Sequence, residues 1–208
     1  MAKQIEGVYE RILECATAEF LEKGFKDASL RVIAAHANTS TNSIYVRFQD
    51  KEGLFRTIVE PVVDEMKKRI LEIQETFHSF DSETQRNTMG TYTAKGMDDI
   101  IDYIYANFDV FRLLLDAAYG TRFQNFVDEL TEIEVEYTYK YMEVIGCESV
   151  KSGVITEEFM HIVTNAFFNG MFEVVRHKMS KDNAKKYIKL LEKYHMAGFE
   201  TIFSPEKY

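Results

Sequence analysis

The residues best suited to specific hydrogen-bond chemistry lie in one polar stretch near the N-terminus. Ile44 and Phe48 are four residues apart, so they would share the buried face of a short helix. The polar side chains around them would then face outward: Thr41, Asn42, Ser43, Tyr45 and Arg47. An outward arginine suits bidentate hydrogen bonding to guanine and an outward asparagine suits adenine, so this segment has the chemistry of a base reader.

The flanking residues predict how this short helix is positioned. Ser29 is suited to cap a preceding helix, and Asn38 ends it because asparagine tolerates the left-handed conformation. Ser40 is suited to cap the reader helix, and Asp50 to cap a third helix that follows. Two short helices joined by a tight turn form the helix-turn-helix arrangement that enters the major groove of DNA.

This stretch resembles the N-terminal DNA-binding domain of the TetR (tetracycline-repressor-like) family of transcription regulators. The matching residues are Ser29, Ile33, Ala34, Ala37, Ser40, Ser43, Ile44, Tyr45, Phe48, Lys51, Glu52 and Leu54, preceded by Ile12, Leu13, Ala16, Phe20, Gly24 and Phe25. The chain departs from the family's frequent Gly, Lys, Gly and His at Asn38, Thr41, Asn42 and Arg47. The change at Asn38 is benign, because asparagine tolerates the left-handed conformation, whereas the other three alter base preference. No relative therefore supplies the operator sequence.

The resemblance implies a role for each polar residue of the segment. The residues expected to hold phosphates are Ser29, Thr39, Ser40, Tyr45 and Lys51, and those expected to face base edges are Thr41, Asn42, Ser43 and Arg47. It also implies a homodimeric repressor that binds a palindromic operator, with half-sites about 34–36 Å apart, and that a small molecule releases.

Composition predicts an all-α protein and locates its charge. The chain has 208 residues, only two prolines and a net charge of −9. Residues 1–60 hold 8 basic and 9 acidic side chains, a net charge of −1, so most of the acidity lies elsewhere. A basic face would require Lys3, Arg31, Arg47 and Lys51 to cluster. Two isolated cysteines and the lack of a leader or membrane-spanning run favour the cytoplasm, with no membrane partner.

We expect a DNA-binding domain over residues 1–52 and an effector-binding and dimerisation domain over residues 53–208. A long helix should start at Lys51, with a kink or break at Pro61. The polar residues 79–90 predict a loop, and helices should follow over residues 93–105, from Phe108 to about Gly120, and over residues 123–144. Two last helices should be capped by Thr156 and Asp182.

The last two helices carry apolar stripes wide enough to need two neighbours. The family resemblance assigns them to a four-helix dimer interface, and inner core is the alternative. The interface residues would be Phe159, Ile162, Val163, Ala166, Phe167, Gly170, Leu191, His195, Phe199 and Ile202.

The middle helices are rich in aromatic residues and methionine, which is typical of a core. The family resemblance also allows a cavity for a small effector, lined by Met66, Met97, Ile101, Tyr105, Phe108, Phe111, Phe126, Tyr137, Tyr141, His161 and Asn165. The interior stripes lack Lys and Arg, which favours a neutral or cationic lipophilic compound over a small anion. We expect no cofactor.

Two other classes of protein remain as alternatives. Glu158–His161 and Glu192–His195 are both E-x-x-H pairs, the pattern that di-iron carboxylate bundles use on two of their helices. The further glutamate ligands such a site needs would have to face inward, whereas Glu129, Glu132 and Glu136 face outward by periodicity, so we expect neither a metal nor catalysis. A helical adaptor that does not bind DNA is the other alternative, and the intact caps with Tyr45, Arg47 and Lys51 argue against it.

Overall fold

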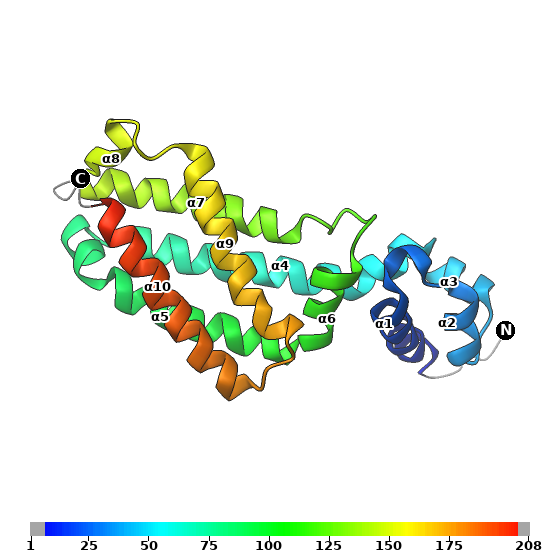
Figure 1. The fold of residues 1–208 in the computed structure, drawn as a ribbon. Coiled ribbons are helices and arrows are strands. Elements are labelled where there is room, and N and C mark those ends of the chain that lie inside the picture. Colours follow the sequence, from blue (N-terminus) through cyan, green and yellow to red (C-terminus); the bar gives the residue numbers. More distant parts are fainter. Residues whose placement is uncertain (1–6, 204–208) are drawn as a thin grey trace. The chain divides into compact units, whose positions relative to one another are not determined.

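The computed structural model describes residues 7–203, and helices dominate them with no strand in that range, so the all-α prediction is confirmed. Figure 1 shows the helices in chain order. Their bounds are α1 Val8–Asp27, α2 Leu30–His36, α3 Thr41–Phe48, α4 Lys51–His78, α5 Ser82–Ala106, α6 Phe108–Arg112, a π-helix η1 Leu113–Ala117, α7 Phe126–Ile145, α8 Glu148–Lys151, α9 Glu157–Arg176 and α10 Lys181–Phe203.

The chain divides into two compact units. The N-terminal unit comprises Met1–Glu65 and Asn107–Phe126, and the C-terminal unit comprises Met66–Ala106 and Val127–Tyr208. Helix α4 therefore begins in the first unit and ends in the second. These compact units do not coincide with the expected domains, 1–52 and 53–208. That division concerns which segment binds DNA, and it stays a prediction.

Aromatic packing holds the helices of the N-terminal unit together. The fully buried ring of Phe55 on α4 lies 5.1 Å from Phe20 and 5.4 Å from Phe25, both edge-on, and 6.3 Å from Phe123. Within the same unit, α1 also packs against α6 and η1. Edge-to-face contacts of this kind add a favourable energy beyond that of burying the large apolar rings. The cluster therefore holds the first turns of α4 against α1.

The turns around α3 follow most of the predicted capping chemistry. Ser40 Oγ accepts a hydrogen bond of 3.2 Å from Ser43 N, and Asp50 Oδ1 accepts one of 2.7 Å from Gly53 N. Asn38 has φ 51°, the left-handed conformation expected where α2 ends. The Ser29 side chain makes no capping hydrogen bond; its backbone N–H instead donates to Glu19 Oε1 at 3.0 Å, so the prediction for that hydroxyl is wrong.

Two further predictions about the helices need correction. Helix α4 continues through Pro61 without a break, although proline has no N–H for the carbonyl of Thr57, and a kink at this residue stays a prediction. Residues 79–90 are not a loop, because α5 begins at Ser82. Asp81 Oδ1 accepts hydrogen bonds from Glu83 N at 3.1 Å and Thr84 N at 3.0 Å, so the polar residues that suggested a loop are the first turns of a capped helix.

The ends of two other helices also differ from their predicted places. The segment from Phe108 is α6 followed by η1 and ends at Ala117, so it is not one regular α-helix. Asp182 does not precede α10 but lies in its first turn, and Ser180 Oγ accepts from Asn183 N at 3.4 Å.

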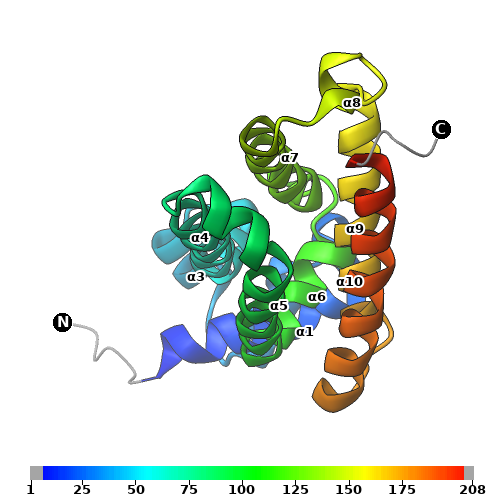
Figure 2. The same cartoon turned by 90° about the vertical axis from the view of Figure 1, so that its left-hand side faces the viewer.

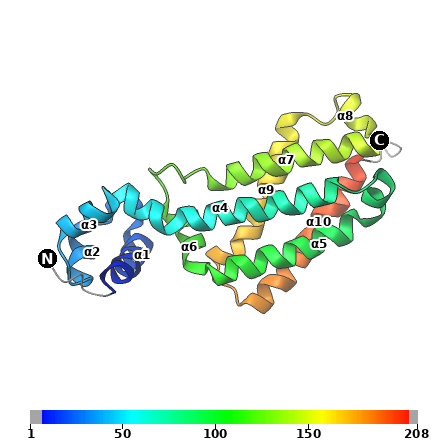
Figure 3. The ribbon, with the colours of Figure 1, turned by 180° about the vertical axis from the view of Figure 1, so that it is seen from behind.

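The C-terminal unit is a helical bundle. Figures 2 and 3 show α7, the second part of α4 and α5 forming one layer, with α9 and α10 against one side of it. Polar contacts join α10 and its leading turn to α5: Lys181 Nζ and Lys185 Nζ lie 3.0 and 2.6 Å from Asp102 Oδ1, and Tyr105 Oη donates to Met179 O at 2.8 Å. These contacts hold α10 against α5.

Candidate functional site

Helix α3 buries one face and exposes the other. Ile44 and Phe48 are buried, and the ring of Phe48 stacks on Tyr9 of α1 at 5.5 Å. Asn42, Tyr45 and Arg47 are exposed, with half of the Tyr45 surface open to solvent. These three side chains are therefore exposed to solvent, as predicted. Their contacts with DNA stay a prediction.

Arg47 folds back along its own helix. Its Nη1 donates to Ser43 O at 3.1 Å and also to Ser43 Oγ. Because a guanidinium carries five N–H donors in a planar fork, this contact leaves others for a partner. It also brings together two of the predicted base-facing residues, Ser43 and Arg47.

Lys51 has a structural role that its sequence position did not reveal. Its Nζ donates to Lys26 O at 2.9 Å and Ala28 O at 3.0 Å, and lies 4.9 Å from the centre of the Phe25 ring. The ammonium thus satisfies carbonyls at the C-terminal end of α1. An ammonium has three donors, so one remains for a phosphate.

We expect Lys51→Ala to lower the unfolding free energy by about 2 kcal/mol, because two charge-assisted hydrogen bonds are lost. Denaturant unfolding measures this change. Lys68→Ala is the matched control, since Lys68 is exposed and forms a surface ion pair with Glu72, so its loss should change stability by less than about 1 kcal/mol. Equal stability of the Lys51→Ala variant and the unsubstituted protein would contradict this role.

The remaining predicted phosphate contacts lie around the same turn. Ser29 and Thr39 are half-buried and Ser40 is exposed. Of the four cations expected to form a basic face, Arg31 and Arg47 are exposed and Lys51 is half-buried, whereas Lys3 lies outside the described residues.

Sequence reasoning missed two residues that position α3. Glu19 is buried although charged, and it links α1 to the start of α2 through Ser29 N. The sequence shows that Glu19 lies three residues after Ala16, on the apolar face of this helix, but it does not show the partner. Gly53 is buried at the start of α4, and a Cβ there would lie 1.9 Å from Phe48 O.

The C-terminal unit contains a cavity of about 160 Å³. Helices α4, α5, α7, α9 and α10 line it with Ile70, Ile73, Gln74, Phe77, His78, Met89, Tyr92, Thr93, Gly96, Met97, Ile100, Glu134, Tyr137, Thr138, Tyr141, Phe167, Phe168, Met171, Met196 and Phe199. Gly96 lets α5 approach α4 closely there, since a Cβ would lie 3.1 Å from the Ile73 side chain.

Three of the eleven residues expected around an effector line this cavity: Met97, Tyr137 and Tyr141. Met66 and Ile101 are buried elsewhere in the C-terminal unit. Phe108, Phe111 and Phe126 belong to the N-terminal unit, where Phe111 and Phe126 contact each other.

The other three predicted effector residues are polar. The hydroxyl of Tyr105 is held by Met179 O, and the Asn165 amide donates to Asp128 Oδ1 at 2.9 Å and Thr131 Oγ1 at 3.3 Å. His161 is half-buried on α9, and it is not among the residues that line the cavity.

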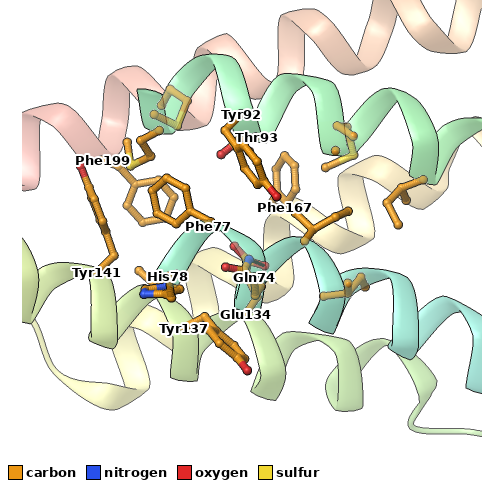
Figure 4. A pocket seen from close by; sticks show the side chains of 18 of the residues that line it. Gln74, Phe77, His78, Tyr92, Thr93, Glu134, Tyr137, Tyr141, Phe167 and Phe199 are labelled. Carbon is orange, nitrogen blue, oxygen red and sulfur yellow. Dashed lines mark hydrogen bonds between the residues drawn. The ribbon is translucent and has the colours of Figure 1, made fainter. Parts of the chain in front are cut away.

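The polar groups of the cavity centre on Glu134. Gln74 Nε2 of α4 donates to Glu134 Oε2 of α7 at 2.8 Å, and Figure 4 shows these two side chains meeting, with Phe77, Tyr92 and Phe167 nearby. Burial raises the pKa of the Glu134 carboxyl, and the hydrogen bond from Gln74 opposes that rise. Burial, with the charge of Lys140, lowers the pKa of His78, so this imidazole is neutral at pH 7.

Helices α9 and α10 expose apolar side chains. Of the residues expected at a dimer interface, Phe159, Ile162 and Ala166 are exposed on α9, and Ile162 keeps 64% of its surface open. The other expected residues are half-buried: Val163, Phe167, Gly170, Leu191, His195, Phe199 and Ile202. Phe167 and Phe199 also line the cavity.

Two exposed residues of α10 were not predicted, namely Leu190 at 68% exposed and Tyr194 at 76%. These two residues are four apart and widen the apolar stripe of this helix, which was the available sequence signal. We call Phe159, Ile162, Ala166, Leu190 and Tyr194 the outer apolar face.

The E-x-x-H pairs do not form a metal site in the described residues. No group of three or more His, Cys, Asp or Glu side chains gathers there to bind an ion. Glu158 is exposed at the start of α9, and its pKa is lowered by hydrogen bonds from its own backbone and the Thr156 side chain. Among the helices of residues 7–203, none has both the length and the apolar character of a membrane span.

Comparison with known proteins places the segment around α3 in a family. Residues 12–58 match the family model of bacterial regulatory proteins of the tetR family. The regulator YhgD of Bacillus subtilis, described as an uncharacterized HTH-type transcriptional regulator, is 35% identical over 75 residues, which cover 36% of this chain and 39% of YhgD. YvdT of the same organism, described in the same words, is 35% identical over 74 residues, covering 34% of this chain and 38% of YvdT. The chain thus spans about two fifths of the length of these relatives.

Solved structures extend the likeness to the whole fold. The crystal structure of a TetR-family transcriptional regulator from Bordetella parapertussis superposes with a TM-score of 0.61 at 16% identity, covering 89% of this chain and 94% of that one. The fold and the α3 segment together define a helix-turn-helix protein with a second helical unit. The chain thus carries a segment that matches the tetR family model, within a fold similar to that of a solved TetR-family regulator.

Proposed function

We propose that this protein is a cytoplasmic DNA-binding transcription regulator, a repressor that binds a palindromic operator as a homodimer. The observation that carries the proposal is α3, a helix capped by Ser40 that exposes Asn42, Tyr45 and Arg47 inside the segment matching the family model. Because one such helix reads only a few base pairs, two copies related by a two-fold axis are needed for a specific site.

The proposed dimer uses the outer apolar face. Contiguous exposed apolar surface on a monomer is typical of an interface between subunits. The two-fold axis would then bring α9 and α10 of one protomer against the same helices of its partner.

The proposed release mechanism runs through α4. This helix supplies Leu54, Phe55 and Val59 to the core of the N-terminal unit, and Ile70, Gln74 and Phe77 to the cavity lining. A small molecule that shifts the second part of α4 therefore acts on a helix that also positions α3. Binding couplings are reciprocal, so operator and effector must weaken each other's binding by the same factor.

The experiment that tests DNA reading is the selection of bound duplexes from a random pool, with the mass of the bound protein measured. We expect one palindromic site bound by a dimer. Failure to enrich any sequence at low salt would overturn the proposal.

We expect Arg47→Ala to relax base preference at one position of each half-site, with a loss of about 1–3 kcal/mol for the preferred base. Repeating the selection with this variant gives the measurement. Arg56→Ala is the control, because Arg56 is exposed on α4 outside the reader helix and should leave base preference intact. An unchanged preference in the Arg47→Ala variant would remove its assigned role.

A further inference from the structure

We propose that the cavity of the C-terminal unit binds a small aromatic organic cation, with Glu134 as its counter-ion. This inference rests on the proposed function, since it names the chemical class of the effector that would occupy the regulator's cavity. Three features support it: the charge of the lining, its aromatic rings and its size.

The lining has one acidic side chain and no Lys or Arg, and the lowered pKa of its histidine, His78, favours the neutral imidazole. Glu134 is the single Asp or Glu among the twenty lining residues, all of them described, and none is Lys or Arg. The hydrogen-bond partner that the structure gives Glu134 is the neutral amide of Gln74. Each carboxylate oxygen accepts more than one hydrogen bond, so this contact leaves acceptor capacity for a guest.

Two lysines near the cavity have their own partners. On the same pair of helices, Lys67 Nζ pairs with Glu129. Lys140 Nζ lies 2.6 Å from Glu136 Oε1 and 4.0 Å from the centre of the Tyr137 ring. A carboxylate in apolar surroundings with a neutral partner is costly, and a guest with a positive charge offsets that cost.

Aromatic rings complete the site. The lining includes seven Phe and Tyr side chains: Phe77, Tyr92, Tyr137, Tyr141, Phe167, Phe168 and Phe199. The faces of such rings attract cations, and their apolar surface suits an organic group. A free anion would meet the Glu134 charge without any lining cation to offset it.

The size of the cavity limits the guest. Its volume of about 160 Å³ is close to that of the engineered cavity of about 150 Å³ that binds benzene. The cavity therefore accommodates a single ring with a compact cationic group. Benzyltrimethylammonium is such a probe, and neopentylbenzene is its neutral isostere.

The test measures binding of both probes to the full chain by calorimetry, without DNA. We expect the cation to bind at least about tenfold more tightly than the neutral isostere, because the quaternary ammonium has no N–H and differs from that isostere in its charge alone. In Glu134→Gln this preference should fall several-fold, because an amide keeps the shape and the Gln74 contact but has no charge, which leaves the attraction of the cation to the aromatic rings. Glu132→Gln on the exposed side of α7 is the matched control and should keep the preference.

Glu134→Gln is expected to fold, because replacing a buried carboxyl with its neutral isostere removes a desolvation penalty, and its melting temperature at pH 7 should be equal or higher. Equal affinity for the two probes, or a cation preference that Glu134→Gln leaves unchanged, would overturn the inference. Operator selection is run on the same preparation. A chain that selects an operator but shows no cation preference refutes this inference alone, and a chain that selects no operator refutes the proposed function whatever the probes do.

Discussion

Gly53→Ala is expected to unfold the junction between α3 and α4 and to weaken operator binding at least tenfold. A Cβ at this position would lie 1.9 Å from Phe48 O and 3.1 Å from Phe48 C. Both atoms belong to the backbone, so no side-chain rotation relieves the clash. The chain must move where Asp50 Oδ1 accepts from Gly53 N, and this movement displaces the end of the reader helix.

Denaturant unfolding should show a loss of about 3 kcal/mol, at the upper end for an overpacked site. Gly90→Ala is the matched control, because this exposed glycine lies inside α5 with nothing within 4 Å of the added Cβ. That control should be neutral or more stable by up to about 1 kcal/mol, since alanine favours a helix. A Gly53→Ala protein with unchanged stability and operator affinity would show that the junction adapts to the added carbon.

Ile162→Glu is expected to separate the proposed dimer and to lower affinity for the full palindrome by about a hundredfold or more. Ile162 is 64% exposed on the outer apolar face, so a charge there is solvated in a single chain. In a two-fold interface the same substitution occurs twice, and two like charges are brought into an apolar contact. The folded protomer should keep its stability while the dimer is lost.

Sedimentation equilibrium measures the mass, and binding to a full palindrome and to a half-site measures the consequence for DNA reading. Val154→Glu is the control, because Val154 is 73% exposed in the segment just before α9 and outside the outer apolar face. A dimer that persists in Ile162→Glu would place the interface on another surface.

Local chemistry predicted the reader helix well. Capping by Ser40 and Asp50, the left-handed Asn38 and the burial of Ile44 and Phe48 depend on residues at most four apart, and the structure has all of them. The roles of Lys51 and Glu19 were missed because their partners lie 23 and 10 residues away, respectively. No periodicity in the sequence reports such a contact.

The cavity was predicted less well for the same reason. Met97, Tyr137 and Tyr141 were expected and line it, but Gln74, His78 and Glu134 were not expected. Glu134 stands in a helix with many other acids. Its place four residues after the buried Leu130 and three before the buried Tyr137 was the signal that distinguishes it from the exposed Glu132. The loop predicted over residues 79–90 was wrong for another reason. The first turns of α5 carry polar side chains, which are equally typical of a loop.

The unbroken course of α4 constrains how this protein can change over generations. Each residue added to a helix turns everything beyond it by about 100° and advances it by about 1.5 Å. One residue inserted between Ile70 and Phe77 would therefore rotate one part of the cavity lining on α4 out of phase with the other. Substitutions in this stretch leave that phase intact. We therefore expect insertions and deletions there to be tolerated far less well than substitutions.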